Sequence, residues 1–474
     1  MANPLPAQWK PDNRLTNNPG TSWTSFSNAR NIAASGDTVH FVWYDDRNGN
    51  NEIYYKRSTD GGSIWGGDTR LTYAPGNSYA PTIIVSGSTV HVFWCDIRIA
   101  DTNEEIFYKR SEDAGTTWGK DTRLTFAPWH SEFPSIAISG SVLHLVWTDV
   151  RNEIGDYENY YKRSTDGGLT WEPDIRLTNN IAYSGFPCVA ASGPAVHVVY
   201  EDQRHGTGEI YYKRSLDEGR TWGSETRLTN DHAESWNPCI SVIGSTVHVV
   251  WNDNRIGSAY EIYYKRSTDG GKTWGTDTRL TNAPGDSQDP NIAASELNVH
   301  VVWYDDRTGS EEIYYKGSTE GGLSWGADVQ LTNASGYAEN TSIAISGSMV
   351  HIAWMDFRNG NDEVYYKRNP TANLPTISGS ALIFDTTQQF SIYASQAATY
   401  LQLKLKTDTN QTAGKPDIKG SLTIWNDKGK KMLTRQIHNH VSVIDISGLQ
   451  NGLYFAAIKT LNKQPVNTKL IILK

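Results

Sequence analysis

The amino-acid sequence predicts an all-β protein, and three observations support this fold class. Aromatic residues are frequent, with 17 Trp and 25 Tyr among 474 residues. Short segments rich in Val, Ile, Tyr and Trp alternate with clusters of Gly, Asn, Asp and Pro, as in chains of short strands joined by turns. Closely similar phrases also recur at regular intervals along most of the chain, which is typical of a repeat architecture.

The central phrase of each repeat is similar to VHVVWNDNR at 247–255, and its histidine occurs seven times. An EIYYKRS segment follows each copy, and an IAxSG-type segment, usually preceded by a proline, comes before it. Apolar residues on both alternating faces of the central segment indicate a strand packed between other strands. Four short strands in each of seven repeats predict a seven-bladed β-propeller with four-stranded blades. The seven histidines are His40, His91, His144, His197, His248, His300 and His351.

The two ends of the repeat region indicate how the ring closes. WKPDNRLT at 9–16 is similar to the outer-strand phrase WGTDTRLT at 274–281, but no repeat precedes it. The last repeat ends with EVYYKRN at 369 and has no outer strand of its own. We therefore expect the N-terminal strand to complete the last blade. The predicted organisation is a propeller over 1–369, a proline-punctuated linker over 370–375 and a small β-sandwich over 376–474.

Charge and composition exclude several classes of partner. The formal net charge is −9. Residues 375–474 hold 12 Lys or Arg and 5 Asp, a balance of +7, so the remaining 31 basic and 47 acidic residues balance at −16. An acidic body argues against nucleic acid. No apolar run approaches the ~20 residues that span a bilayer. The segment MANPLPAQWK lacks the features of a signal peptide, so we expect the signal of an exported protein to be absent from this chain.

Three cysteines do not form a disulfide framework or a metal cluster. Cys188 and Cys239 follow a proline at matching points of adjacent repeats, so a bridge between them is an alternative. Buried free thiols, with Cys95 as the third, are the favoured prediction.

One further phrase carries a family resemblance. The pattern Ser-x-Asp-x-Gly-x-Thr-Trp is the Asp-box, or BNR repeat, and residues 9–369 resemble the sialidase-type Asp-box propeller family. We expect Asp269 to accept hydrogen bonds from turn amides, Gly271 to adopt positive φ and Trp274 to pack at the blade edge. In the family these boxes lie away from the active site, so the resemblance implies a ligand site on the opposite face. The matches begin at Ser58, Ser111, Ser164, Ser215, Ser267 and Ser318, and Glu320 replaces the Asp in the last.

A repeated Asp/Arg pair follows the central strand on that opposite face. Examples are Asp45 with Arg47 and Asp253 with Arg255, each accompanied by a glutamate on the returning strand, such as Glu52 or Glu261. We expect the arginine to pair with this glutamate across the hairpin. A feature repeated seven times forms either structural ion pairs across the hairpin or seven shallow sugar sites, and we favour the ion pairs. The repeated histidine is expected to be a hydrogen-bonded core residue.

A single site at the propeller axis requires residues that depart from the repeat. The segments that lead into the inner strands carry an arginine, several carboxylates and aromatic side chains, which are the components of a carbohydrate site. A solvated polar rim is the alternative. The candidates are Arg30, Glu132, Trp236, Asp289 and Glu339, with Trp129, His130, His232 and Glu234 in the preceding loops.

The sialidase motifs are incomplete in this chain. Arg30 stands in ARNIA at the position of the family's first arginine, but the Ile-Pro that follows it there is missing. The loop Asn48–Asn51 lacks the acidic residue that would serve as general acid, and no further unique arginines complete a carboxylate clamp. Sialidases also have six blades. Catalytic residues therefore remain unassigned, and it is uncertain whether the protein is an enzyme.

The C-terminal region resembles the sorting domain of the type IX secretion system of Bacteroidota. The segments that carry the resemblance are SLTIWNDKGKKML, VSVIDISGLQNGLYFAAIKT and the final KLIILK. The resemblance implies recognition by the secretion machinery and a secreted or cell-surface location. A generic β-sandwich module is the alternative.

The sequence thus predicts an exported propeller that binds glycans or another extracellular polymer. The first alternative is a sialidase-like exo-glycoside hydrolase, and the second is a protein-interaction scaffold. No cofactor or metal is predicted. Axial carboxylates are compatible with Ca²⁺, but no ligand spacing demands it.

Overall fold

The protein is described here by a computed structural model. The described residues are 9–25, 29–100, 103–152, 155, 157–370, 372, 390–394, 400–405, 419–426, 428, 430–438, 441–445, 452–460 and 466–472. The chain forms two compact units, residues 1–373 and 374–474. The predicted linker 370–375 lies mostly outside the described residues.

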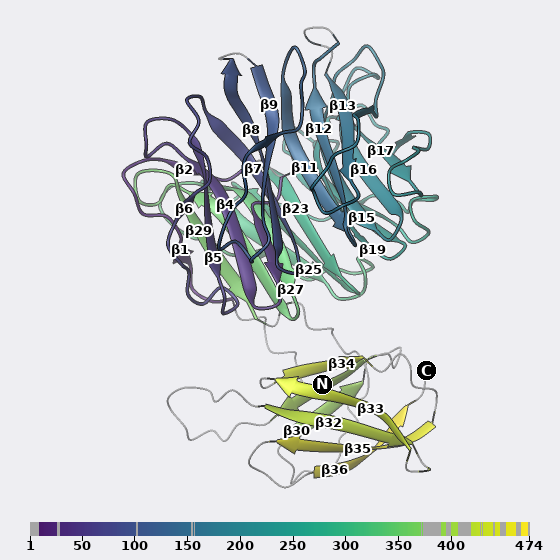
Figure 1. Cartoon of the computed structure of the whole chain (residues 1–474). Helices are drawn as coiled ribbons and strands as arrows, with labels where there is room; N and C mark the ends of the chain where they lie inside the picture. Colours follow the sequence, from purple (N-terminus) through teal and green to yellow (C-terminus); the bar gives the residue numbers. More distant parts are fainter. Residues whose placement is uncertain are drawn as a thin grey trace. The chain divides into compact units, whose positions relative to one another are not determined.

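Seven antiparallel sheets in the first unit are arranged around a common axis, as Figure 1 shows. Blade 1 consists of β2 (Ser22–Trp23), β3 (Ile32–Ser35), β4 (Thr38–Asp45), β5 (Glu52–Ser58) and β6 (Thr69–Arg70), in which β2 and β3 pair with the same strand. Each of the other six blades has four strands. In blades 2 to 6 these strands pair in the order in which they follow one another along the chain, and in the last blade the outer strand is the N-terminal one. The predicted seven-bladed propeller is therefore confirmed.

Blades 2 to 4 contain the strands that supply much of the candidate site. Blade 2 has β7 (Ser78–Ser86), β8 (Thr89–Ala100), β9 (Asn103–Ser111) and β10 (Thr122–Arg123). Blade 3 has β11 (Ser131–Ser139), β12 (Val142–Asp149), β13 (Glu158–Ser164) and β14 (Ile175–Arg176). Blade 4 has β15 (Ser184–Ser192), β16 (Ala195–Asp202), β17 (Glu209–Ser215) and β18 (Thr226–Arg227).

Blades 5 to 7 complete the ring. Blade 5 has β19 (Ser235–Ile243), β20 (Thr246–Asp253), β21 (Glu261–Ser267) and β22 (Thr278–Arg279). Blade 6 has β23 (Ser287–Ser295), β24 (Asn298–Asp305), β25 (Glu312–Ser318) and β26 (Val329–Gln330). Blade 7 has β27 (Ala338–Ser346), β28 (Met349–Asp356), β29 (Glu363–Asn369) and, as its outer strand, β1 (Asn13–Arg14).

The N-terminal strand closes the ring as predicted. β1 pairs with β29, with Asn13 opposite Tyr366, and Arg14 forms a 2.7 Å ion pair with Glu363. The Trp9 ring packs edge-on against Tyr315 of blade 6, with 5.0 Å between centroids. The closure therefore joins the first residues of the unit to its last two blades.

The repeated histidine lies in the core between blades. His248 is fully buried, and its Nδ1 is 2.8 Å from the hydroxyl oxygen of Tyr264. Burial, with a smaller contribution from the Arg266 charge, lowers the pKa of His248 to about 4. The ring is therefore neutral at pH 7, which confirms the predicted hydrogen-bonded core histidine.

The Ser-x-Asp-x-Gly-x-Thr-Trp phrase forms a turn that links neighbouring blades. Asp269 Oδ1 accepts hydrogen bonds from the amides of Lys272 and Thr273, at 3.0 and 2.9 Å. Gly271 has a φ of 76°, and a Cβ there would lie 1.9 Å from the hydroxyl oxygen of Tyr212 in blade 4. Trp274 packs edge-on against the same tyrosine ring at 4.9 Å. The phrase thus has the structural role that the sequence predicts.

The second unit contains two antiparallel sheets. One has the order β30 (Phe390–Ala394), β31 (Tyr400–Leu405) and β34 (Val441–Asp445). The other has the order β33 (Lys431–His438), β32 (Lys419–Asn426), β35 (Gly452–Thr460) and β36 (Val466–Ile472). Leu422 and Ile424 of β32 are buried. A small β-domain in this region agrees with the sequence prediction.

Candidate glycan-binding site

The strand registers define two faces of the propeller. In blade 2, Asp96 at the end of the second strand lies opposite both Ser78, which begins the inner strand, and Glu105, on the third strand. We call this end of the blades the front face. The Ser-x-Asp turns follow the other end of the third strand. The Asp/Arg loops and the starts of the inner strands therefore share the face opposite those turns, as expected.

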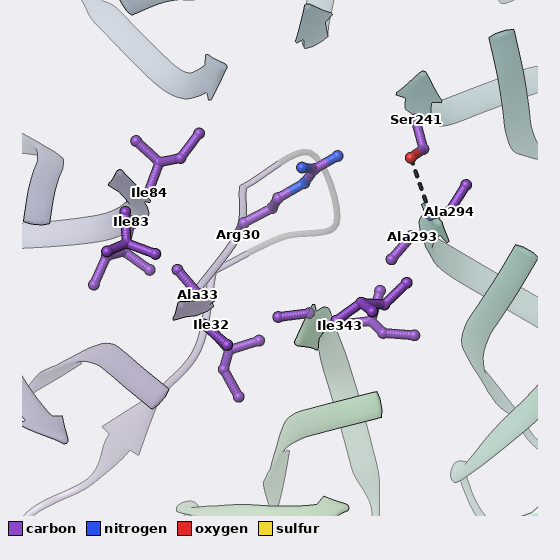
Figure 2. Close-up of a pocket in the computed structure, with 13 residues that line it drawn as sticks. Arg30, Ile32, Ala33, Ile83, Ile84, Ser241, Ala293, Ala294 and Ile343 are labelled. Carbon is purple, nitrogen blue, oxygen red and sulfur yellow. Dashed lines mark hydrogen bonds between the residues drawn. The ribbon is translucent and has the colours of Figure 1, made fainter. Parts of the chain in front are cut away.

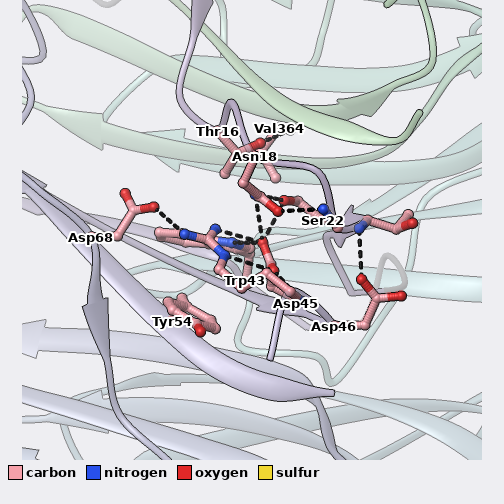
Figure 3. Close-up of polar contacts among 12 residues, drawn as sticks. Thr16, Asn18, Ser22, Trp43, Asp45, Asp46, Tyr54, Asp68 and Val364 are labelled. Carbon is pink, nitrogen blue, oxygen red and sulfur yellow. Dashed lines mark hydrogen bonds and ion pairs between the residues drawn. The ribbon is translucent and has the colours of Figure 1, made fainter. Parts of the chain in front are cut away.

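The repeated Asp/Arg pairs are occupied by structural contacts. Arg47 donates to both oxygens of Asp45, at 2.7 and 2.6 Å, and to Asp68 of the outer strand at 2.7 Å. Ser22 Oγ and Trp43 Nε1 also donate to Asp45, which has no exposed surface (Figure 3). These contacts satisfy the buried charge, and they leave little of either group free for a ligand.

The expected pairing of this arginine with the returning glutamate is wrong. Glu52 pairs with Arg70 of the outer strand at 2.6 Å. Register explains the difference, because Asp45 and Glu52 lie directly opposite one another and Arg47 follows the end of β4, from where it folds back onto Asp45.

Blade 5 has the same arrangement. Arg255 binds Asp253 and Asp277, at 2.5 and 2.6 Å, and also Asp231 at 3.0 Å. The glutamate of the returning strand, Glu261, pairs with Arg279 of the outer strand.

A β-bulge interrupts the inner strand of six blades close to the front face. Each bulge contains a residue with a φ near 50°, a conformation that is strained for residues other than glycine. Such strain persists where the surrounding structure enforces it, often at functional sites. The bulges therefore place six side chains of four kinds around the axis: Ala80, Phe133, Phe186, Asn237, Asp289 and Asn340.

Blade 1 differs from the other six because its chain between β2 and β3 is longer. Thr24 Oγ1 donates to the carbonyl oxygen of Asn340 in blade 7, and Ser25 Oγ donates to that of Pro81 in blade 2, at 2.8 and 2.7 Å. This segment connects the two neighbouring blades at the axis.

Arg30 crosses the central channel. Its Nη2 donates to the carbonyl oxygen of Ile240 on the inner strand of blade 5, at 2.9 Å. The arginine borders a cavity of about 210 Å³ that is otherwise lined mainly by alanine, isoleucine and valine side chains of the inner strands, with Ile83, Ala294 and Ile343 among them (Figure 2). Arg30 therefore lies on the axis, as predicted, but its guanidinium already has a main-chain partner.

A pair of carboxyl groups lies between blades 2 and 3. The β8–β9 hairpin carries Glu104, whose carboxyl group lies close to that of Glu132 of β11. Burial, together with the charge of Glu104, raises the pKa of Glu132 to about 8. His130 Nδ1 is 3.8 Å from Glu104 Oε2, and burial, with a contribution from the charge of Glu104, raises the pKa of Tyr79. At pH 7 this arrangement holds a protonated carboxyl beside a second carboxyl group.

Aromatic rings adjoin the carboxyl pair on the side of blade 4. Phe133 and Phe186, at consecutive bulges, have ring centroids 4.6 Å apart. The ring centroid of Tyr183 lies 6.4 Å from that of Phe186 and 5.2 Å from that of Tyr157. Burial raises the pKa of Tyr183, and the charge of Glu132 contributes to the shift. The group offers a continuous aromatic surface beside two carboxyl groups.

Blade 5 contributes a second aromatic and acidic group. The rings of Trp236 and Tyr260 lie 5.6 Å apart, and the Tyr260 hydroxyl donates to Glu234 at 2.9 Å. Asn237 Nδ2 donates to Asp289 Oδ1 at 2.5 Å. Burial raises the pKa of Asp289 to about 6.

Two more carboxyl groups near the axis have raised pKa values. Burial raises the pKa of Glu201 to about 7. Burial also raises the pKa of Glu339 to about 7, and the charges of Glu311, Asp289 and Asp362 add to this shift. We call the axial group of Glu104, Glu132, Glu201, Glu234, Trp236, Asp289 and Glu339 the mouth.

The predicted site residues fall into three groups. Glu132, Glu234, Trp236, Asp289 and Glu339 belong to the mouth, and His130 contacts it through Glu104. Trp129 and His232 are exposed on loops. The residues of the third group, Asp45, Arg47, Asp253 and Arg255, are held in the structural ion pairs.

Sequence reasoning missed Glu104, Tyr79, Tyr183 and Glu201. The sequence did contain a signal for Glu201. In each central strand one residue stands between the Trp (Tyr in blade 4) and the Asp, and this residue varies among blades. This residue lies opposite the one that precedes each bulge, as Glu201 does with Gly185. The variable residues are Tyr44, Cys95, Thr148, Glu201, Asn252, Tyr304 and Met355.

Arginines of the rim have carboxylate partners throughout the propeller. The paired residues are Arg14, Arg47, Arg70, Arg98, Arg123, Arg151, Arg176, Arg204, Arg227, Arg255, Arg279, Arg307 and Arg358. Within the described residues, no group of three or more His, Cys, Asp or Glu side chains is placed to hold a metal ion. The mouth therefore consists of carboxyl and aromatic groups.

Comparison with protein families identifies the second unit. Residues 391–473 match the model of the secretion system C-terminal sorting domain. This match confirms the resemblance of the C-terminal region to a sorting domain and indicates export. A search of curated proteins found no match for the sequence. In the described part of the chain, no helix is long and apolar enough to cross a membrane.

Solved structures with the same fold include two polysaccharide lyases. An ulvan lyase of family PL25, bound to a GlcA(1-4)Rha3S saccharide, has a TM-score of 0.54 and 11% identity over 74% of this chain and 94% of its own. The polysaccharide lyase Uly1 has a TM-score of 0.53 and 11% identity over 76% and 99% of the two chains. A Trypanosoma rangeli sialidase in complex with the inhibitor DANA has a TM-score of 0.45 and 10% identity over 85% and 86%. At these identities the likeness concerns the fold alone.

Proposed function

We propose that this exported protein binds a glycan at the mouth of its front face. The observation that carries the proposal is the contrast between rim and mouth. The Asp/Arg pairs of the rim repeat from blade to blade and are saturated by structural contacts, whereas the bulge position near the axis carries alanine, phenylalanine, asparagine or aspartate, depending on the blade. The sorting domain supports export, and the polysaccharide-acting propellers of the same fold support a saccharide as the ligand.

The side chains of the mouth suit a sugar. Pyranose rings stack their C–H faces on aromatic side chains such as Trp236, and carboxyl oxygens such as those of Glu234 accept hydrogen bonds from hydroxyl groups. The Tyr260 hydroxyl fixes Glu234 at 2.9 Å, so the carboxyl group next to the tryptophan is already oriented.

The charges of the mouth favour a neutral or amino-bearing sugar. Glu132, Glu201, Asp289 and Glu339 have raised pKa values because burial already makes their negative charge unfavourable. A sugar carboxylate would add a further negative charge to this group. The rim arginines are paired with carboxylates, and Arg30 is bound to a carbonyl oxygen. Sialic acids and uronic acids therefore fit the mouth poorly.

Titration calorimetry with three defined oligosaccharide sets tests the proposal. Cello-oligosaccharides are neutral, chitosan oligosaccharides are positively charged and oligogalacturonates are negatively charged. We expect binding of the first or second set and none of the third. Trp236→Ala should weaken this binding, whereas Leu323→Ala, at a 69% exposed residue in the turn that begins at Ser318, should leave it unchanged.

Failure of all three sets to bind would contradict the proposal, as would binding that both variants retain at full strength. Capture of a protein partner without any sugar would instead support an interaction scaffold.

Glycoside hydrolysis is a second candidate, and the Glu104–Glu132 pair favours it. Glu132, whose pKa burial raises to about 8, keeps its proton at pH 7 and could donate it to a glycosidic oxygen, and Glu104 is a second carboxyl group close to it. The assay measures new reducing ends in oligosaccharides that bind. Under this hypothesis Glu132→Gln abolishes their release and preserves binding. If the wild-type protein releases no reducing ends from a bound oligosaccharide, the protein is a binding protein.

A further inference from the structure

Two cysteines of neighbouring blades face each other across the blade interface. Cys188 on β15 and Cys239 on β19 are each the first paired residue after the bulge of their inner strand. Their sulfur atoms are 3.8 Å apart, and both side chains are buried, with exposures of 1% and 0%. The sulfurs are therefore in van der Waals contact, and neither strand has to change its register for them to meet.

The surroundings of the pair favour the thiolate form of one cysteine. Contact with Cys239 lowers the pKa of Cys188, and the positive charge of Arg30 in the channel lowers it further. The same contact raises the pKa of Cys239, together with burial. One thiolate next to one thiol is the arrangement from which thiol–disulfide exchange proceeds.

The third cysteine has a different environment. Cys95 on β8 is fully buried, and burial raises its pKa, as do the charges of Glu104 and Glu132. It therefore remains a protonated thiol. Cys95 provides an internal reference for the chemistry of the other two.

We propose that Cys188 and Cys239 form an inter-blade disulfide in the exported protein. The sorting-domain match places the mature chain outside the cytoplasm, where cysteine pairs are oxidised. The S–S bond of about 2.05 Å requires the sulfurs, which are 3.8 Å apart, to approach by less than about 2 Å. The bond closes a loop with a sequence separation of 51 residues, one repeat of the propeller.

The oxidant is an external disulfide that reacts while the inner strands are still accessible during folding. The Cys188 thiolate attacks one of its sulfurs and releases the first thiolate, which takes up a proton. The Cys239 thiol then loses its proton to solvent. The resulting thiolate attacks Cys188 Sγ and releases the second external thiolate, which also takes up a proton. Two cysteine thiols and one external disulfide thus give one protein disulfide and two external thiols.

Thiol counting on the full-length protein tests the proposal. The chain is folded in the presence of oxidised glutathione, unfolded without reductant, alkylated with iodoacetamide and analysed as peptides by mass spectrometry. We expect alkylation at Cys95 alone and a peptide pair joined through Cys188 and Cys239. Alkylation at all three cysteines would overturn the proposal, as would a link that involves Cys95.

Two variants and a melting experiment complete the test. Cys95→Ser should keep the linked peptides and leave no free thiol, and Cys239→Ser should leave Cys188 and Cys95 free. Reductant should lower the melting temperature of the wild-type protein by about 5 °C, because the cross-link restricts the unfolded chain. In Cys239→Ser the melting temperature should not respond to reductant. An unchanged wild-type melting temperature would contradict a stabilising cross-link.

Discussion

The rim and the mouth of the propeller have opposite relations to the sequence repeat. At the rim, Asp45 and Asp253 have the same partners in their own blades, an arginine two residues later and a buried tryptophan two residues earlier. At the mouth, the equivalent bulge positions carry alanine, phenylalanine, asparagine and aspartate. Repetition in this molecule therefore marks what holds the blades together, and variation marks where a ligand would meet the protein.

The largest effect on stability is expected from a substitution that breaks an Asp/Arg ion pair of the rim. Asp253→Ala removes a buried carboxylate and leaves Arg255 without its bidentate partner, so the free energy of unfolding should fall by about 3 kcal/mol. Urea unfolding followed by tryptophan fluorescence measures the change. Oligosaccharide affinity of the folded fraction should stay the same, and a selective loss of affinity would assign a binding role to the rim.

A smaller effect is expected for the turn that joins neighbouring blades. Gly271→Ala places a Cβ 1.9 Å from the Tyr212 hydroxyl oxygen and should lower the free energy of unfolding by about 2 kcal/mol. Gly270 is a matched control, because its φ of 71° is similar but a Cβ there meets nothing within 4 Å. Gly270→Ala should therefore have about half this effect. Equal losses in the two variants would show that backbone strain alone requires the glycine.

A substitution in the mouth should change the affinity for oligosaccharides rather than the stability of the protein. Trp236→Ala removes a half-buried ring that packs on Tyr260, and oligosaccharide affinity should fall about tenfold, which corresponds to about 1.4 kcal/mol. Calorimetry at constant pH measures the dissociation constant. A large drop in thermal stability with unchanged affinity would make Trp236 a structural residue.

The smallest expected effect concerns pH. The unfolded Glu132 carboxyl titrates near 4.5, and the folded one titrates at about 8. As the pH rises between these values the unfolded state loses its proton first, so stability falls. Glu132→Gln removes this contribution, because its side-chain amide does not titrate in this pH range.

The measurement is urea unfolding at pH 6.5 and pH 8. Histidines of the unfolded chain titrate near pH 6.5 in both proteins, so the comparison with Glu132→Gln removes their contribution. The wild-type protein should be less stable at pH 8, and the variant should show a difference smaller by about 1 kcal/mol. Parallel pH dependence of the two proteins would contradict a buried, protonated Glu132.

The sequence repeat allowed the fold to be predicted from the sequence. The seven histidines fixed the number of blades, and the isolated WKPDNRLT predicted the pairing of β1 with β29. The turn residues Asp269 and Gly271 also have the predicted roles, because hydrogen bonding and positive φ are local properties.

Properties that depend on non-local contacts were harder to predict. The partner of Arg47 depends on the register of β4 and β5 and on the outer strand, so Glu52 was chosen incorrectly. Glu104 was missed because its position depends on strand pairing in the β8–β9 hairpin that resumes beyond Asp96 and Glu105, with Ala100 opposite Asn103. The contact between Cys188 and Cys239 depends on the distance between two inner strands, which no single repeat encodes.

The pairing of β1 with β29 also sets an order of events during synthesis. β1 is translated before β29 and has no partner until nearly the whole propeller sequence has been made. The Trp9 ring likewise has no packing partner until Tyr315 has been made. The last blade therefore cannot form, and the ring cannot close, before translation has passed residue 369.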